Sequence, residues 1–326
     1  KKDATISQTP VIMGASAVGI ALQVIAGETV EKNILNPFYV IDASNADDPT
    51  NWANSTHEGA EAPADSAAVT PKIGFSLSTL GNAFFVGMRA GIVDKCDELG
   101  VELVETNADG DIATQAAQME DLISQGVTAL IVNPVDSDAI VASEKKAVEA
   151  GIPVIYCDRG STGDGYTAFI ATDNIAMGEL GANEIVKFLT ERYGEPKGNV
   201  VEIQGLIGTS AARDRGEGFN NIMKDYPNIK IVAQQAGDFN QETSLNVMQN
   251  IIQANDQIDA VYGHNDDCTL GALKAIESAG LLKPVGEDGH IYIIGIDGIY
   301  DALTAIKDGK KDATISQTPV IMGASA

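Results

Sequence analysis

Short apolar runs alternate with longer amphipathic stretches along most of the chain from residue 73 onward. The short runs are rich in Val and Ile, as in strands, and the longer stretches place apolar residues at helical spacing. The predicted strands are 73–78, 101–105, 128–132, 153–157, 199–203, 229–233, 258–262 and 291–296, and the predicted helices are 82–99, 113–125, 137–150, 175–192, 211–226, 241–254 and 269–280. We also expect a strand at 38–42 and one in the segment ATISQ, which occurs at 4–8 and again at 313–317. Because the strands are apolar on both sides, we expect parallel sheets with helices on both faces.

The alternation of strands and helices runs twice, with a restart after residue 173. A chain of 326 residues also exceeds the usual size of one domain. The pattern therefore predicts an α/β protein with two doubly wound parallel-sheet lobes.

The first 17 residues of the chain recur without a change at its end, as residues 310–326. The first copy continues into residues 18–45, and the second copy follows residues 306–309. Residues 46–71, rich in Ala, Asp, Pro, Ser and Thr, have the composition of a linker. We interpret the chain as a circular permutant whose parent ran from residue 73 to 309, through one copy of the repeat, and on through 18–45.

This order divides the chain into lobes. We expect 9–37 with 72–172 in one lobe, 173–309 with 1–8 and 38–45 in the other, 46–71 as the linker and 310–326 as a surplus duplicate. Apolar residues from Val11 to Ile25 form a stripe that crosses the boundary between residues 17 and 18. Since a break there would cut a helix, we expect the first copy to occupy the fold. Residues 310–326 would then be displaced or docked on a neighbouring molecule in a domain swap.

Polar side chains follow almost every predicted strand, at the edge where open α/β sheets bind ligands. Those side chains are Ser78, Asn82, Asn133, Asp158, Arg159, Asn265 and Asp297. Phe84, Phe85 and Phe239 could face the apolar C–H surfaces of a sugar ring, and Arg215 adds a guanidinium for its hydroxyls. Single residues also have simpler interpretations, since Asn133 precedes Pro134 and Asp297 precedes Gly298, as in turns. Their convergence on one edge favours a sugar site.

Composition and motifs exclude several classes of function. The chain carries 46 acidic and 21 basic residues, a net charge of −25 that disfavours nucleic acid and anionic membranes as partners. The three cysteines have no metal-site or disulfide spacing, and the three histidines do not cluster. We find no Gly-rich nucleotide motif after a strand and no nucleophile motif. We therefore expect no enzyme activity, catalytic residue, cofactor or bound metal.

Several segments resemble bacterial ribose-binding proteins, notably STLGNAFF (78–85), NPVDSDAI (133–140), CDRG (157–160) and GTSAARDRGEGF (208–219). The resemblance implies the type I periplasmic binding protein fold, with two lobes joined by a three-strand hinge and a ligand cleft between them. By matching motif, the ligand-binding residues would be Ser78, Asn82, Phe84, Phe85, Asn133, Asp158, Arg159, Arg215, Phe239, Asn265 and Asp297, with Gln8 or its twin Gln317 at the hinge.

The same resemblance implies a function and its partners. The ligand would be D-ribose or a similar monosaccharide, and the closed form would be recognised by the membrane permease of an ABC transporter. Location would be periplasmic or extracellular, lipid-anchored in a Gram-positive parent, and we expect no signal peptide in this chain. The alternative is the sugar-sensing core of a LacI-type transcriptional regulator without its DNA-binding headpiece, because such regulators share this fold.

Overall fold

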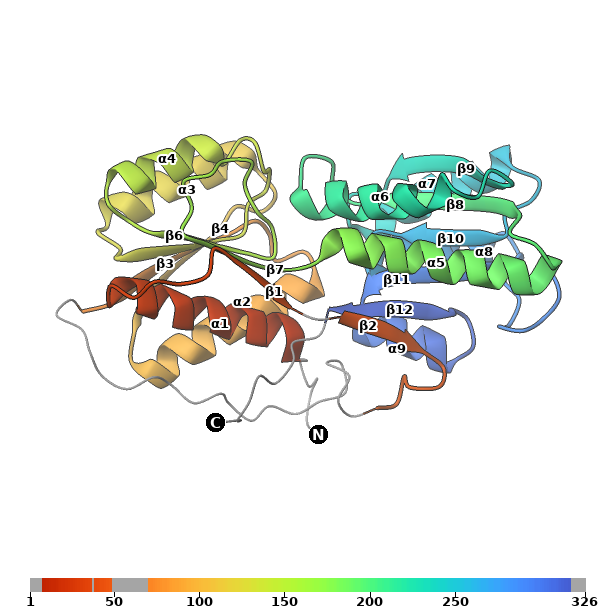
Figure 1. Ribbon diagram of the computed structural model, residues 1–326, viewed down its shortest axis with the longest axis horizontal. Helices are drawn as coiled ribbons and strands as arrows, with labels where there is room; N and C mark the ends of the chain where they lie inside the picture. Colours follow the sequence, from red (N-terminus) through yellow and green to blue (C-terminus); the bar gives the residue numbers. More distant parts are fainter. Residues whose placement is uncertain (1–7, 37, 49–69, 318–326) are drawn as a thin grey trace.

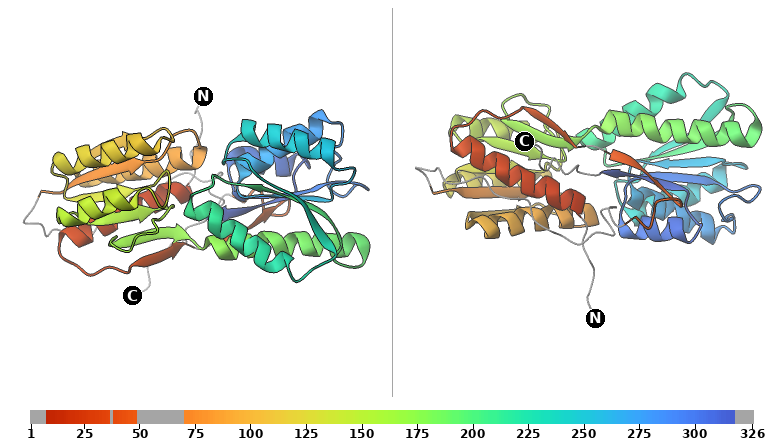
Figure 2. Two further views of the ribbon diagram at one scale, coloured as in Figure 1. Left: turned by 90° about the horizontal axis from the view of Figure 1, so that it is seen from above. Right: turned by 60° about the horizontal axis from the view of Figure 1, so that its bottom comes forward.

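The computed structural model describes residues 8–36, 38–48 and 70–317, and these residues form two α/β lobes side by side (Figure 1). Each lobe is built on a sheet that has six strands among the described residues. The views in Figure 2 show helices on both sides of each sheet. The predicted two-lobe α/β architecture is confirmed.

The sheet of the first lobe is entirely parallel, with strand order β1-β7-β6-β5-β3-β4. The strands are β1 (Asn33–Asn36), β3 (Lys72–Leu77), β4 (Glu102–Asn107), β5 (Ala129–Val132), β6 (Val154–Cys157) and β7 (Ala168–Thr172). The helices are α1 (Gln8–Ile25), α2 (Ala83–Leu99), α3 (Ile112–Ser124) and α4 (Val141–Glu149). Alternate residues of β5 point to opposite faces, with Ile131 packing under α1 and α2, and Leu130 under α3 and α4.

The sheet of the second lobe has strand order β2-β12-β11-β10-β8-β9. The strands are β2 (Phe38–Asp42), β8 (Gly198–Gln204), β9 (Ile229–Ala236), β10 (Ala260–Gly263), β11 (Tyr292–Asp297) and β12 (Ala313–Gln317). The helices are α5 (Asn174–Tyr193), α6 (Ser210–Met223), α7 (Gln241–Ala254), α8 (Asp266–Ser278) and α9 (Tyr300–Lys307).

The second sheet departs from the all-parallel expectation at one edge, where β2 pairs antiparallel with β12. The register pairs Phe38 at the start of β2 with Gln317 at the end of β12. The reason is the short path from β1. Asn36 ends β1 in the first lobe, and Phe38 begins β2 at the carboxyl end of the other strands of the second sheet. From that edge β2 can only run in the opposite direction.

The repeated segment contributes to the fold from both of its copies. Helix α1 comes from the first copy and runs unbroken across residues 17 and 18, as the apolar stripe predicts. It packs closely on α2, since a Cβ at Gly91 would lie 1.8 Å from the carbonyl oxygen of Val11. The strand segment of the repeat, ATISQ, is however used from the second copy. Its residues 313–317 form β12, which lies between β11 and β2.

The expectation that residues 310–326 are surplus was therefore wrong for residues 313–317. The reason is the turn after α9, where use of the first copy would have required the chain to leave the fold. It passes directly into Lys311 and Asp312, whose side chains are buried, and Lys310 N donates to the Ala305 carbonyl at 2.9 Å. These contacts anchor the strand of the second copy. Residues 1–7 and 318–326, the rest of the two copies, lie outside the described residues, as does most of the expected linker.

The chain crosses between the lobes at the cleft edge of the sheets. One crossing joins β7 to α5 through Asp173, and another joins β1 to β2. The third strand expected at the hinge would lead from β12 of the second lobe into α1 of the first. Here β12 ends at Gln317 and α1 begins at Gln8, so these two elements are not consecutive in the chain.

Candidate ligand-binding site

A cavity lies between the two lobes, at the carboxyl ends of both sheets. Its lining residues are Asn82, Phe84, Phe85, Asp158 and Arg159 from the first lobe, and Ala211, Arg215, Phe239, Asn265, Asp297 and Gln317 from the second. The cavity is the place that the topology predicts for a ligand.

The first lobe contributes aromatic rings beside a guanidinium. Asn82 caps α2 by accepting a hydrogen bond from Phe84 N at 2.7 Å, which fixes the two phenylalanines at the first turn. Phe84 and Phe85 meet edge to face with ring centroids 5.7 Å apart. The guanidinium carbon of Arg159 lies 4.8 Å from the centroid of Phe85, within the range of a cation–π contact.

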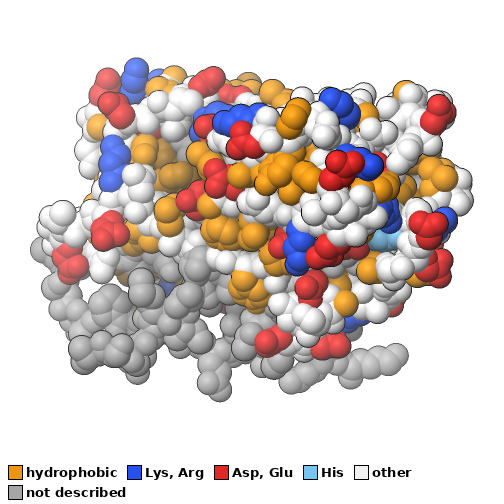
Figure 3. Space-filling view, turned by 45° about the vertical axis from the view of Figure 1, so that its right-hand side comes forward, with side chains coloured by type: hydrophobic (Ala, Val, Ile, Leu, Met, Phe, Trp, Pro, Cys, Tyr) orange, Lys and Arg blue, Asp and Glu red, His pale blue; other side chains and the backbone are white. Residues whose placement is uncertain are grey.

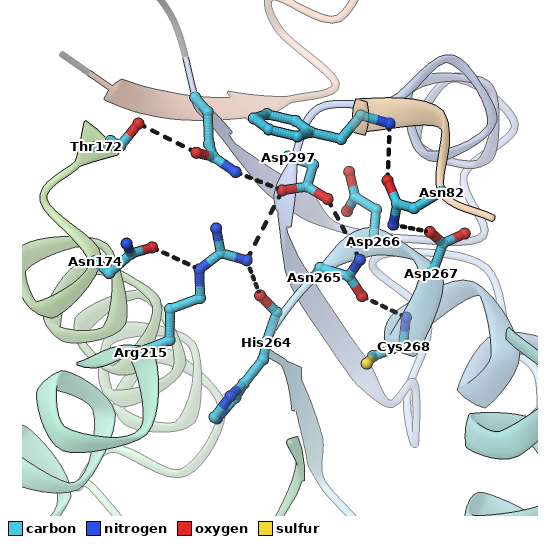
Figure 4. Close-up of polar contacts among 12 residues, drawn as sticks. Asn82, Thr172, Asn174, Arg215, His264, Asn265, Asp266, Asp267, Cys268 and Asp297 are labelled. Atoms are coloured by element: carbon cyan, nitrogen blue, oxygen red, sulfur yellow. Dashed lines mark hydrogen bonds and ion pairs between the residues drawn. The ribbon is translucent and has the colours of Figure 1, made fainter. Parts of the chain in front are cut away.

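In the part of the wall that comes from the second lobe, the central group is the carboxylate of Asp297 at the end of β11 (Figure 4). Gln317 donates to its Oδ1 at 2.7 Å, and Asn265 donates to its Oδ2 at 3.3 Å. The guanidinium of Arg215 forms an ion pair with Oδ1 at 3.8 Å. Both carboxylate oxygens are thus held in place by groups from β12, α6 and the start of α8.

Arg215 is itself fixed by two further hydrogen bonds. Its Nε donates to Asn174 Oδ1 at 2.9 Å, and its Nη1 donates to the backbone carbonyl of His264 at 2.6 Å (Figure 4). The imidazole of His264 turns away and pairs with the buried carboxylate of Glu202 at 2.8 Å. His264 therefore contributes its backbone to the site, while its side chain belongs to the core beneath.

Three residues of the cavity wall have left-handed backbone conformations that L-residues rarely adopt. The φ angles are 68° at Asp158, 54° at Phe239 and 124° at Asp297. Such conformations cost about 1–3 kcal/mol each and concentrate at functional sites. Gly205 leaves the space that Phe239 needs, since a Cβ there would lie 2.1 Å from the ring.

The cavity encloses two carboxylates and two guanidiniums away from bulk water. Burial raises the pKa of Asp158, against the opposing effect of Arg159 and Arg215. Burial also raises the pKa of Asp297 to about 8, opposed by Arg215, and lowers the pKa of Arg159 to about 10. Buried charges of this kind gain from a ligand with many hydrogen-bonding groups.

Most of the residues singled out in the sequence converge here, but two lie behind the wall. Ser78 donates to Asn133 Oδ1 at 2.5 Å, and Asn133 donates to the Cys157 carbonyl at 2.9 Å. Both side chains are buried and neither lines the cavity. Asn133 thus holds the backbone just before Asp158. Ser78 and Asn133 therefore support the cavity wall from behind.

Of the two candidate glutamines, Gln317 lines the cavity, and Gln8 is the first residue of α1. The sequence reasoning also missed Ala211, at the first turn of α6, because a lone alanine carries no chemical signal.

Direct hydrogen bonds join the lobes beside the cavity. Gly160 N donates to Ser210 Oγ at 3.0 Å, and Ser210 N donates to Ser137 Oγ at 3.0 Å. Asn82 Nδ2 donates to Asp267 Oδ2 at 2.7 Å (Figure 4). The described lobes are therefore in contact around the cavity.

The described residues hold no metal site and no membrane-spanning helix. Within the described ranges, no three His, Cys, Asp or Glu side chains converge as a metal site. No helix in this part of the chain is both long and apolar enough to cross a membrane. On the face shown in Figure 3, acidic and basic side chains are interspersed around apolar ones, so its described surface has no continuous basic stripe of the kind that binds nucleic acid.

Two α/β lobes that enclose an aromatic and charged cavity define a two-lobe solute-binding fold. A family model described as the periplasmic binding protein domain matches residues 73–326, and the chain belongs to this family. Ribose import binding protein RbsB of Bacillus subtilis (strain 168) is 37% identical over 276 residues, which cover 85% of this chain and 83% of that protein.

Two solved structures share the fold. An ABC transporter solute-binding protein of Bacillus halodurans C-125, with bound myo-inositol, has a TM-score of 0.70 at 32% identity, covering 77% of this chain and 84% of that one. A periplasmic solute-binding protein of Actinobacillus succinogenes 130z, with bound D-allose, has a TM-score of 0.67 at 32% identity, covering 76% and 85%. All three relatives are named as binding proteins and none as an enzyme.

Proposed function

We propose that this protein binds D-ribose or a closely related monosaccharide between its lobes, as the solute receptor of an ABC-type sugar importer. The observation that carries the proposal is the wall of the cavity, where three phenylalanines stand beside two carboxylates and two guanidiniums. Aromatic rings suit the C–H faces of a sugar, and charged groups satisfy its hydroxyls. A location in the periplasm or outside the cell accords with this role.

The relatives support the class of ligand more strongly than its identity. The B. subtilis protein is named for ribose, whereas the two solved neighbours hold myo-inositol and D-allose. All three ligands are polyhydroxylated rings or sugars of similar size. Ribose is the first candidate because that relative is 37% identical over most of the chain.

Each residue of the wall has a role in this proposal. Phe84, Phe85 and Phe239 would cover the faces of the ring, and the polar residues of the wall would bind its hydroxyls. Ser78 and Asn133 would act from behind the wall, through the backbone before Asp158. The ligand would bridge both lobes, and the lobes would close on it by rotation about the crossings near residues 37 and 173.

The chain order is part of the proposal. We infer a circular permutation, because the family match runs continuously from residue 73 to 326 while residues 8–42 supply α1, β1 and β2 to the same two lobes. We propose the lobe boundaries given above, except that residues 313–317 take the place in the second lobe that was expected for residues 1–8. Exchange of a repeated segment between molecules would give a domain-swapped dimer.

Calorimetric titration of the purified chain with D-ribose, D-allose and myo-inositol tests the proposal. We expect saturable binding with D-ribose preferred. Arg215→Ala should weaken binding by roughly 10- to 150-fold, since a hydrogen bond to a charged group contributes about 1.5–3 kcal/mol. Arg213→Ala is the matched control, because Arg213 lies on the same helix but is exposed and pairs with Asp214. Absence of binding to all three ligands at millimolar concentration would refute the proposal.

A further inference from the structure

A buried ion pair lies directly behind the cavity in the second lobe. Lys311 Nζ is 3.2 Å from Asp266 Oδ1, and both side chains are completely buried. The ammonium also donates to Thr269 Oγ1 at 3.0 Å. Neither charged residue lines the cavity, yet Asp266 directly follows Asn265, which does.

The carboxylate of Asp266 holds the turn that follows Asp297. Its Oδ2 accepts hydrogen bonds from Gly298 N at 2.8 Å and from Ile299 N at 3.1 Å. Thr314 on β12 donates to the same carboxylate at 2.8 Å. Asp297 and Gly298 both have positive φ, at 124° and 76°, so this turn needs such external support.

The charges in this part of the core are coupled. Facing Asp297 are Arg215 on α6 and the carboxylates of Asp266 and Asp267 on α8, with Arg159 across the cavity. Arg215 favours the ionised form of Asp297, whereas the two carboxylates oppose it.

Facing Lys311 are three carboxylates, those of Asp266, Asp312 and Asp297. Burial lowers the pKa of Lys311, and these carboxylates oppose that shift. Lys311 is therefore the positive charge that offsets Asp266.

We propose that Lys311 and Asp266 act together as positioning residues for the ligand, with Asp266 fixing the turn at Asp297 and Lys311 balancing the charge of Asp266. The inference rests on the proposed function in taking Asp297 as a group that binds sugar. It also assigns a role to the second copy of the repeat, because Lys311 belongs to that copy. Its counterpart in the first copy is Lys2.

The test compares Lys311→Met with the identical substitution at the other copy, Lys2→Met. Without the ammonium, the unbalanced charge of Asp266 should make Asp297 harder to ionise. We expect D-ribose affinity at pH 7 to fall about tenfold or more, as for a shift of about one pKa unit, and the pH profile of binding to move to higher pH. Lys2→Met should leave both unchanged.

A double variant guards against failure of the single one to fold. Lys311→Met with Asp266→Asn removes both charges and keeps an oxygen to accept the backbone hydrogen bonds of Gly298 and Ile299. We expect the pH profile to return toward that of the parent. A purely structural role for Lys311 would lower affinity equally at every pH and would not be rescued in this way.

Titration of the Asp297 carboxyl by ¹³C NMR, assigned with Asp297→Asn, separates this inference from the proposed function. We expect the Asp297 pKa to rise in Lys311→Met whether or not ribose is the ligand. An unchanged pKa in that variant, or equal effects of Lys2→Met and Lys311→Met, would overturn the inference. Failure of the parent to bind any sugar would refute the proposed function and leave the NMR result to decide this one.

Discussion

The hydrogen bonds between the lobes beside the cavity predict that Ser210, which does not line the cavity, affects the affinity for sugar. In Ser210→Ala, Gly160 N loses the acceptor that lies 3.0 Å away on the opposite lobe. Ser210 is buried at the start of α6, where the cap is provided by Thr209, so alanine should leave the helix intact. The change therefore removes a contact that exists only when the lobes meet.

The size of the effect follows from that single hydrogen bond. An ordinary hydrogen bond contributes about 0.5–1.5 kcal/mol, and a buried donor left without a partner costs about 1–3 kcal/mol. In the proposed hinge motion, the open form would keep Gly160 N in water. The loss would then fall on the closed form alone and would reduce the apparent affinity by the same free energy. We expect weakening of about 5- to 150-fold, chiefly through faster dissociation.

Calorimetry for affinity and stopped-flow fluorescence for dissociation measure the effect of Ser210→Ala. The control is Ser161→Ala, because the hydroxyl of Ser161 accepts its hydrogen bond from Gly163 N at 2.9 Å within the first lobe. The reasoning would be refuted if Ser210→Ala bound sugar as tightly as the parent, or if Ser161→Ala weakened binding as much.

Two further predictions concern the wall itself. Burial raises the pKa of Asp297 to about 8, so the folded protein keeps a proton that the unfolded chain loses near its ordinary pKa of about 3.9. The free energy of unfolding of the ligand-free protein should therefore fall as pH rises from about 4 to about 8, by at most about 1.4 kcal/mol per pH unit. Calorimetry should show a weaker dependence of this free energy on pH in Asp297→Asn than in the parent. The same dependence in both proteins would contradict the prediction. Gly205→Ala would place a Cβ 2.1 Å from the ring of Phe239, an overpacking that costs about 1–3 kcal/mol and should weaken sugar binding about tenfold. Gly19→Ala, whose new Cβ meets no atom within 4 Å, should not change affinity, and equal affinity in the two variants would contradict the prediction.

The lobes were predictable from sequence because their central strands are contiguous apolar runs. Two strands were not among those predicted. β1 (Asn33–Asn36) has only four residues with polar ends, and it alternates between exposed and half-buried positions at an edge. β7 (Ala168–Thr172) follows a loop rich in Gly, Ser and Thr, so it lacks a helix before it to complete the alternation.

The polar residues of the cavity wall were predictable where they directly follow a strand, as at Asp158, Asn265 and Asp297. The groups that hold these residues were not, because their role depends on burial that no local pattern reveals. Lys311 stands in the sequence DGKKD, which favours an exposed turn, yet its side chain is completely buried. The apolar stripe correctly placed α1 in the first copy, but apolar spacing says nothing of the buried pair of Lys311 and Asp266, which involves the second copy.

Two amides of the cavity wall, Asn82 and Asn265, are also the caps of α2 and α8. Replacing such a cap with alanine costs about 0.5–2 kcal/mol, and only Ser, Thr, Asp or Gly could replace asparagine at modest cost. Selection for a new sugar, in evolution or in the laboratory, would therefore meet a stability penalty at these positions. Ala211 and Gln317 line the same cavity without capping a helix, and they offer the less constrained route to altered specificity.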